Sequence, residues 1–481
     1  MRERDTVSRR DVVKAGVAAA GLATWTSFPA AAANAVEIAS GTTITEPGEY
    51  ALADDIVASR GSAAIDVAAS GVTIDGQGHT VSNDRGECIS VSRGANTVAV
   101  RNVRLSGARN GVAVAGDDVT VFNSLVESNG ENGVAISGAR RTRIDSCLVR
   151  ENEQTGVSAN ESEETAVRSS LVSANGFEGI RLAGTSGVVV ARCLLTGNGT
   201  RDERRGRGVT VGGDRPTEAL RLADNRLLSN VAEGVSSRVG ARAGDVRELS
   251  VVGNVVADNG RSAFDLGTVF GADVRTNAFV RNGSGVGANF EQSYIQQNCF
   301  VDDELGRRFS GSVVSRNVLV GSGLVDEFVS SSVSANLVVG AERGLGGVSE
   351  RSSYVGNTIV GCDGDGVRFD ESFENDFRLN RISSNGGHGV RFDQAVGNRL
   401  KFNVIQANGA DGLRVFGFDN DDPGVGNVVR KNTIGVNGGA GIRLFDTVDG
   451  LVARNALCAN TGGDIVPGGL ATDTVVDNDR C

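Results

Sequence analysis

The sequence predicts an all-β protein built as a parallel β-helix, a solenoid of about 18 rungs. Three observations predict this fold. Glycine accounts for 67 of the 481 residues and aromatic residues for only 5%, so we expect small and branched aliphatic side chains, rather than large rings, to fill the interior. A short glycine motif and an asparagine both recur at a step close to 23 residues. No apolar period of 3.6 residues persists for three turns, which argues against long helices.

The glycine motif is a glycine followed by an aliphatic residue, any residue and a second apolar residue. Alternation of this kind, with β-branched residues at the apolar positions, indicates short strands. The motif glycines are Gly111, Gly133, Gly156 and Gly179 in the first half of the chain, and Gly366, Gly389, Gly412 and Gly441 in the second. Short strands, tight turns and no helix are what one rung of a parallel β-helix requires, with rungs about 4.8 Å apart.

The asparagines form the strongest signal, because they recur at steps of 19 to 29 residues over more than half of the chain. They are Asn225, Asn254, Asn277, Asn298, Asn317, Asn336, Asn357, Asn380, Asn403, Asn432, Asn455 and Asn478. Stacked asparagines can hydrogen-bond from rung to rung through their side-chain amides. We therefore expect them to stand in single file at one turn of the solenoid. A leucine-rich repeat shares the period and is the alternative, but it needs a denser leucine pattern.

Residues 1–35 are interpreted separately from the fold. Arg9 and Arg10 precede an apolar stretch over residues 15–25, and residues 33–35 read Ala-Asn-Ala. This arrangement resembles a twin-arginine signal peptide with a small-residue cleavage site, and a disordered basic tail is the alternative. The apolar stretch is too short to remain as a membrane span. The resemblance implies Tat export, so we expect residues 36–481 to form one β-helix domain that is secreted or held at the cell surface.

The charge composition limits the partners of the chain. The net charge is −11, and only three of the 48 basic residues are lysines. An acidic protein of this kind is not expected to bind nucleic acid or anionic membranes nonspecifically. The lysine-poor, acidic composition also resembles that of exported proteins from high-salt (halophilic) microbes.

Two segments near the start of the expected domain carry a family resemblance. Gly41–Tyr50 and Val72–His79 resemble the first rungs of the right-handed parallel β-helix repeat proteins of the pectate-lyase-like superfamily. Within that superfamily they are similar to the NosD-type and to the carbohydrate-binding and sugar-hydrolase branch. The resemblance covers about residues 36–481 and implies a single-stranded, right-handed parallel β-helix. It specifies the fold better than the activity, because function on such scaffolds depends on sites.

A column of arginines is the clearest candidate binding surface. Arginine occupies the same position in four successive glycine motifs, and in two of them an aspartate follows two residues later. Alternation along the strands predicts that these side chains share one sheet face and bind substrate there. The residues are Arg368, Asp370, Arg391, Asp393, Arg414 and Arg443. Guanidinium groups about 4.8 Å apart would match carboxylates or sulfates along an anionic polysaccharide. The alternative is a solvated arginine–aspartate ladder.

Catalytic and metal-binding residues are less clearly indicated. His388, Asp393 and Asp422 are the candidates for acid–base chemistry, because Gly-His-Gly and Asp-Asp pairs also occur in β-helical polygalacturonases. Asp419, Asp421 and Asp422 lie in one insertion and offer oxygen ligands for Ca²⁺, although an acidic solvated loop is the favoured explanation. Apart from this possible Ca²⁺ site we expect no cofactor.

The cysteines divide into two expectations. Cys147 and Cys193 lie two rungs apart, about 9.6 Å, which exceeds the reach of a disulfide, so they should be free buried thiols. Cys458 and Cys481 each follow a ladder asparagine by three residues and are expected to bridge adjacent rungs.

Three functions remain open from the sequence. The first is non-catalytic or structural binding of an extracellular or cell-surface polysaccharide, most plausibly an anionic one. The second is a polysaccharide lyase or epimerase acting on uronic-acid glycans, in which an arginine would neutralise the substrate carboxylate and a base would remove the C5 proton. The third, implied by the NosD-type resemblance, is an accessory role in maturing a metal cofactor. The sequence does not fix an oligomeric state.

Overall fold

The computed structural model describes residues 35–202, 204–237, 246–324, 326–417, 423–469 and 471–480. These residues form strands and turns and contain no helix, so none of them forms a helix that could cross a membrane. Counted over both units, the strands stack in about 18 right-handed turns. The all-β solenoid expected from the sequence is therefore confirmed.

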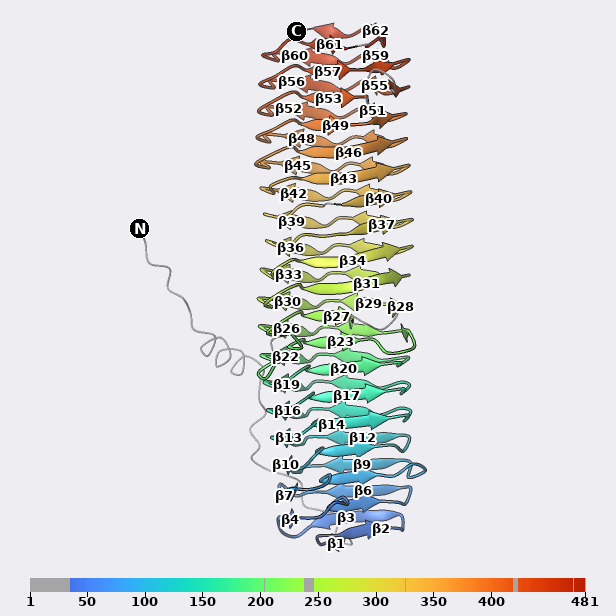
Figure 1. Cartoon of the computed structure of the whole chain (residues 1–481), viewed down its shortest axis with the longest axis vertical. Helices are drawn as coiled ribbons and strands as arrows, with labels where there is room; N and C mark the ends of the chain where they lie inside the picture. Colours follow the sequence, from blue (N-terminus) through green and yellow to red (C-terminus); the bar gives the residue numbers. More distant parts are fainter. Residues whose placement is uncertain are drawn as a thin grey trace, which may run out of the picture. The chain divides into compact units, whose positions relative to one another are not determined.

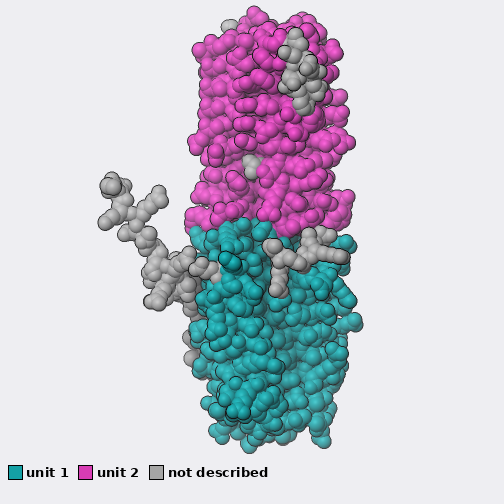
Figure 2. All heavy atoms as spheres, viewed as in Figure 1, with its two compact units in different colours: residues 1–265 teal, residues 266–481 magenta. Residues whose placement is uncertain are grey.

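The chain divides into two compact units, residues 1–265 and 266–481 (Figure 2). Within each unit a typical turn contributes one short strand to each of three parallel sheets, A, B and C. In unit 1, for example, one turn contains β12 (Val119–Phe122) of sheet A, β13 (Leu125–Glu127) of sheet C and β14 (Val134–Ser137) of sheet B. Figure 1 shows strands of successive turns lying side by side.

The alternation seen in the sequence sets which side chains are buried. Along β14, Val134 and Ile136 point inward and are buried, whereas Ala135 between them is half-buried. The next turn repeats the pattern on β17 (Val157–Asn160), where Val157 lies in register with Val134. Each turn thus buries its apolar residues against those of its neighbours, and the period-two pattern orders the core.

The motif glycines are explained by close packing between turns. Gly389 precedes β49 (Val390–Phe392). A Cβ atom added at Gly389 would lie 2.6 Å from the carbonyl oxygen of Gly412 on the next turn. Only glycine fits this approach, so the repeat glycine marks the point where each coil enters sheet B.

The predicted file of asparagines is present at the turn between sheets A and C. Asn380 Nδ2 donates to Asn403 Oδ1 at 2.9 Å, and Asn403 Nδ2 donates to Asn432 Oδ1 at 2.9 Å. Asn455 continues the file at 3.0 Å. All four side chains are buried, so the ladder satisfies polar groups that the interior would otherwise leave unpaired.

A second ladder, which the sequence reading missed, follows five residues behind the first. Asn385, Asn408 and Asn437 lie at the turn between sheets C and B and are linked in the same way, at 2.9 and 3.0 Å. The constant offset of five residues from Asn380, Asn403 and Asn432 was the available signal.

The expectation that large rings would be absent from the core is wrong for unit 2. Phenylalanines and one tyrosine stack along its interior, with Phe279 and Phe300 4.9 Å apart and Tyr354 and Phe377 4.3 Å apart between ring centroids. These rings are fully buried. The low aromatic content of the whole chain concealed their concentration in one stretch.

The cysteines agree with the rung geometry where the structure describes them. Cys147 and Cys193 are free and buried, as predicted. Cys458 is disulfide-bonded, but Cys481 lies outside the described residues, so their pairing stays a prediction. Cys88, Cys299 and Cys362 are also free.

We expect these free thiols to differ sharply in reactivity. Burial raises the pKa of Cys88, Cys147 and Cys193 to about 12, so only about one in 10⁴ of each is thiolate at pH 8. Cys299 is only half-buried. Titration of the native protein with a thiol reagent at pH 8 should therefore label Cys299 rapidly and these three only on unfolding. Cys299→Ser should remove the rapid phase, and rapid labelling of Cys147 would contradict the burial.

Candidate functional site

The four arginines of the predicted column lie on successive strands of sheet B in unit 2. The strands are β46 (Val367–Phe373), β49 (Val390–Phe392), β53 (Leu413–Phe416) and β57 (Ile442–Phe445). Arg368 is in register with Arg391, Arg391 with Arg414, and Arg414 with Arg443. The apolar residues on either side of each arginine are buried. The guanidinium groups therefore project from one sheet face at steps of about 4.8 Å.

Two of the arginines are neutralised within their own strand or the turn that follows it. Arg368 Nε donates to Asp370 Oδ1 at 2.9 Å. Arg391 donates from Nε to Asp393 Oδ2 at 2.9 Å and from Nη2 to the same oxygen at 2.8 Å. The hydrogen bond with Asp393 raises the pKa of Arg391. This part of the column matches the alternative of an arginine–aspartate ladder.

Arg443 is neutralised by a residue that the sequence reading did not single out. Its Nε and Nη2 donate to the two carboxylate oxygens of Asp411 at 2.8 and 3.1 Å. The Ala440 backbone N–H also donates to Asp411, at 2.7 Å. Burial opposes ionisation of Asp411, but the hydrogen bonds from Arg443 and Ala440 outweigh it and lower the pKa of this carboxyl.

Arg414 differs from the other three because the described residues offer it no ion-paired carboxylate. Two residues after Arg368 and Arg391 the chain has aspartate, but two residues after Arg414 it has Phe416. The Arg414 guanidinium carbon lies 4.2 Å from the centroid of the Phe416 ring. Its Nε is buried without a hydrogen-bond partner. Burial, followed by repulsion from Arg391, lowers the pKa of Arg414.

His388 completes the cluster beside Arg414. Its Nδ1 accepts a hydrogen bond from the Asp411 backbone N–H at 3.1 Å, and its Nε2 lies 3.3 Å from Arg414 Nη1. The His388 backbone N–H donates to Asp365 Oδ1 at 2.6 Å. Burial lowers the pKa of His388, outweighing attraction from Asp365 and Asp411 and assisted by repulsion from Arg414 and Arg391. The ring is therefore neutral near pH 7.

The structure brings together some of the predicted site residues but not all. His388 lies beside Arg414 in the column, whereas Asp393 accepts hydrogen bonds from Arg391 and forms no hydrogen bond or ion pair with His388. Asp419, Asp421 and Asp422 lie outside the described residues, so the catalytic role of Asp422 and the Ca²⁺ site stay predictions. Asp365 and Asp411 were missed, although each precedes a motif glycine 23 residues from His388.

The described residues hold no group of three or more histidine, cysteine, aspartate or glutamate side chains placed to bind a metal ion. The chemical strengths of the cluster are instead hydrogen-bond donors and positive charge. Guanidinium groups recognise carboxylate, sulfate and phosphate through paired N–H bonds.

Comparison with family models finds two partial matches. Residues 63–237 match the right-handed beta helix region, and residues 309–463 match the periplasmic copper-binding protein (NosD) model. The second match includes the whole arginine column. Comparison with curated protein sequences finds no match.

Solved structures give distant matches. The periplasmic alginate epimerase AlgG is 14% identical, with 77% of this chain and 78% of that chain covered and a TM-score of 0.30. DFA-IIIase from Arthrobacter chlorophenolicus A6 is 13% identical, with 58% and 83% covered and a TM-score of 0.37. PfbA, a surface adhesin of Streptococcus pneumoniae, is 8% identical, with 62% and 83% covered and a TM-score of 0.31. These matches are too distant to indicate a shared site or activity.

The donor set of this chain does not fit the copper named in the NosD description. Copper sites use thioether, thiolate or imidazole ligands. The chain has one methionine, Met1, and two histidines, His79 and His388. His388 is engaged with Asp411 and Arg414, and among the described residues no cysteine joins a metal-binding group. The described residues therefore offer no set of ligands that fits the copper named in the NosD description.

Proposed function

We propose that this chain, a right-handed parallel β-helix repeat protein of the pectate-lyase-like kind, binds an anionic polysaccharide without transforming it. The binding surface is the arginine column around Arg414, and the ligand groups are carboxylates such as those of uronic acids. The observation that carries the proposal is the buried, unpaired Nε of Arg414 in a column whose other arginines all have carboxylate partners.

The surroundings of Arg414 favour an anionic ligand. Neighbouring guanidinium groups about 4.8 Å apart repel one another by about 1 kcal/mol even at the dielectric constant of water. The aspartates of the column relieve this repulsion at the other three arginines, in the pairs Arg368–Asp370, Arg391–Asp393 and Arg443–Asp411. A carboxylate bound at Arg414 would relieve it there and would supply the acceptor that its buried Nε lacks.

Two further features suit a sugar acid. With Nδ1 accepting the Asp411 N–H, neutral His388 carries its proton on Nε2, so Nε2 and Arg414 Nη1 are two donors 3.3 Å apart. Beside them Phe416 and Phe445 stack with centroids 4.8 Å apart, and Phe445 is exposed. Neighbouring donors next to an apolar ring surface are the usual make-up of a ligand site.

The hydrogen bonding of His388 favours binding over catalysis. A lyase or an epimerase needs a base with a free lone pair to take the C5 proton of a uronic acid. The one lone pair of neutral His388 faces the Asp411 N–H in one tautomer and Arg414 in the other. Neither arrangement leaves it open to a substrate proton.

Location outside the cytoplasm is part of the same proposal. The twin-arginine-like segment at residues 1–35 supports export, although residues 1–34 lie outside the described part of the chain. The match to a model of periplasmic proteins supports it as well. A polysaccharide of the envelope or the surroundings would then be the accessible ligand.

The test removes the central pair of the column. We expect Arg391→Ala combined with Arg414→Ala to weaken binding to polygalacturonate or alginate by about 10- to 100-fold at low salt, because the lost charge-assisted contact at Arg414 is worth about 1.5–3 kcal/mol and Arg391 is already paired with Asp393. Affinity electrophoresis and calorimetry would measure the change. The matched control is Arg381→Ala with Arg399→Ala, which removes the same charge from sheets C and A.

Each outcome of this experiment decides something. Equal losses of affinity in the two double variants would mean that the column is only a solvated arginine–aspartate ladder. Unchanged affinity in the variant that lacks Arg391 and Arg414 would mean the same. Ultraviolet absorbance from unsaturated uronate products would show that the protein is a lyase. An altered uronate composition by NMR would show that it is an epimerase. Either result would contradict non-catalytic binding. Absence of both products alongside the expected loss of affinity supports non-catalytic binding.

A further inference from the structure

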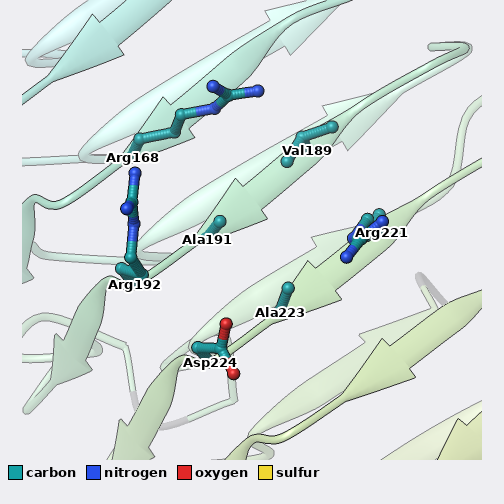
Figure 3. A pocket seen from close by; sticks show the side chains of 7 residues that line it. All are labelled: Arg168, Val189, Ala191, Arg192, Arg221, Ala223 and Asp224. Carbon is teal, nitrogen blue, oxygen red and sulfur yellow. The ribbon is translucent and has the colours of Figure 1, made fainter.

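A second cluster of arginines surrounds a pocket on sheet A of unit 1 (Figure 3). The pocket has a volume of about 280 Å³. It spans three strands: β18 (Ala166–Arg168), β21 (Val189–Ala191) and β25 (Arg221–Ala223). Its lining consists of Arg168, Val189, Ala191, Arg192, Arg221, Ala223 and Asp224. None of these residues belongs to the arginine column of sheet B.

The hollow arises from small side chains in one register column. Arg168 is in register with Ala191, and Ala191 with Ala223. The turns that carry Ala191 and Ala223 therefore present only a methyl group at this position, whereas the preceding turn presents the long side chain of Arg168. In Figure 3 the two alanines lie between the three arginines, and the Arg192 side chain extends toward Arg168. The small side chains of the two alanines leave the space of the pocket, and the three arginine side chains line its sides.

The three arginines lack the carboxylate partners that arginines on neighbouring turns of unit 1 possess. Arg150 pairs with Glu127 at 2.7 Å, and Arg207 pairs with Glu233 at 2.8 Å. Among the described residues Arg168, Arg192 and Arg221 form no ion pair, and Arg168 Nε is buried without a hydrogen-bond partner. These three charges exceed the single negative charge of Asp224, the one carboxylate in the lining.

We propose that this pocket binds a tetrahedral oxyanion, the sulfate or phosphate group of an ester. Such a group carries several acceptor oxygens in a compact volume, so it can take N–H bonds from guanidinium groups on different sides at once. A carboxylate has only two oxygens in one plane and would leave part of the cluster unpaired. Asp224 lies at the lower edge of the pocket in Figure 3. Its negative charge would oppose the binding of a more highly charged anion.

The site is distinct from the proposed carboxylate surface in sheet, unit and ligand chemistry. It stands whether or not the arginine column of sheet B binds a glycan. A groove of about 480 Å³ adjoins it, sharing Arg168 and Val189 and extending over Arg143 to Asp118. That groove provides room for the remainder of an ester next to the bound group.

Calorimetric titration of the full chain with inorganic sulfate and with inorganic phosphate at low salt tests the oxyanion site. We expect Arg168→Gln and Arg192→Gln each to weaken sulfate binding by about 10-fold, since each removes charge-assisted hydrogen bonds. Ala191→Leu keeps every charge but fills the pocket, and it should weaken binding at least as much. The charge-matched control is Arg226→Gln on sheet C, with an expected change below about twofold. Circular dichroism and the thermal midpoint confirm folding of each variant.

The outcomes separate a built site from general attraction and identify the source of the group. Equal weakening by Arg226→Gln, or unchanged binding in Ala191→Leu, would overturn the proposal. Dextran sulfate retained by the wild type but released by Ala191→Leu, with plain dextran not retained, identifies a sulfated polysaccharide. Preference for a sugar phosphate over sulfate identifies a phosphate ester. Arg414→Ala should leave all these titrations unchanged, so failure of one site is distinguishable from failure of the other.

Discussion

Replacing Phe369 by alanine is expected to lower the free energy of unfolding of the protein by about 4 kcal/mol. The ring is fully buried. It lies 5.3 Å from Tyr354, 5.9 Å from Phe377 and 5.9 Å from Phe392 between centroids. Alanine removes the burial of the ring and four aromatic contacts, the fourth being with Phe328 at 6.4 Å, and leaves a cavity that the neighbouring turns cannot close. Urea unfolding followed by circular dichroism measures the loss.

An exposed phenylalanine provides the matched control. Phe402 is 48% exposed and contacts Lys431 at 5.4 Å, so Phe402→Ala should cost less than about 1 kcal/mol. Phe369→Leu, which fills most of the space, should recover more than half of the loss. A cost for Phe369→Ala as small as that of the control would mean that the aromatic stack contributes little to the stability of unit 2.

Replacing Asn403 by alanine is expected to cost about 3 kcal/mol, mainly through the partners it leaves behind. Asn403 Nδ2 donates to Asn432 Oδ1 and to the Phe377 carbonyl oxygen at 2.9 and 3.0 Å. Its own Oδ1 accepts the backbone N–H and the side-chain amide of Asn380 at 3.0 and 2.9 Å. Asn380 Nδ2 keeps its bond to the Tyr354 carbonyl oxygen, and Asn432 Oδ1 keeps the Asn403 backbone N–H. Alanine therefore takes the partner from the Asn380 backbone N–H and removes the side-chain donor of the Phe377 carbonyl, at about 1–3 kcal/mol for each group that water cannot reach.

Hydrogen–deuterium exchange offers a local readout beside urea unfolding. Amides of β52 (Val404–Gln406) and of the strands that pair with it should lose protection in Asn403→Ala. The control is Asn289→Ala on β34 (Val286–Glu291), because the Asn289 side chain is half-buried and makes no hydrogen bond among the described residues. If both alanine variants were equally stable, the ladder would be a consequence of the fold and not a support for it.

The sequence predicts the architecture well because steric and hydrogen-bonding constraints restrict which residue can occupy certain positions of the repeat. Gly389 cannot carry a Cβ beside the Gly412 carbonyl, and Asn403 must match Asn380 and Asn432. Such constraints recur at many turns, so they appear as a period. Composition averaged over the chain predicts less. Among the described residues the buried phenylalanines and the buried tyrosine all lie between Phe264 and Phe392, and an overall aromatic content of 5% conceals that concentration.

The candidate site is predicted only in part, for a similar reason. Positions on the strands follow from alternation, which is why Arg368 and Arg414 fall in one column. Partners that cross from one turn to another do not follow from alternation. Asp411 pairs with Arg443 across a separation of 32 residues, and the lone state of Arg414 depends on Phe416 standing where an aspartate stands on earlier turns.

The asparagine file keeps its spacing over coils of unequal length. The amide-to-amide distance is 3.0 Å across the 19 residues from Asn298 to Asn317 and 2.9 Å across the 29 residues from Asn403 to Asn432. The longer link between β53 and β55 (Val428–Arg430) leaves both strands in register with their neighbours. Evolution can thus lengthen a single coil without rebuilding the others, and a foreign peptide inserted between these two strands should leave the scaffold undisturbed.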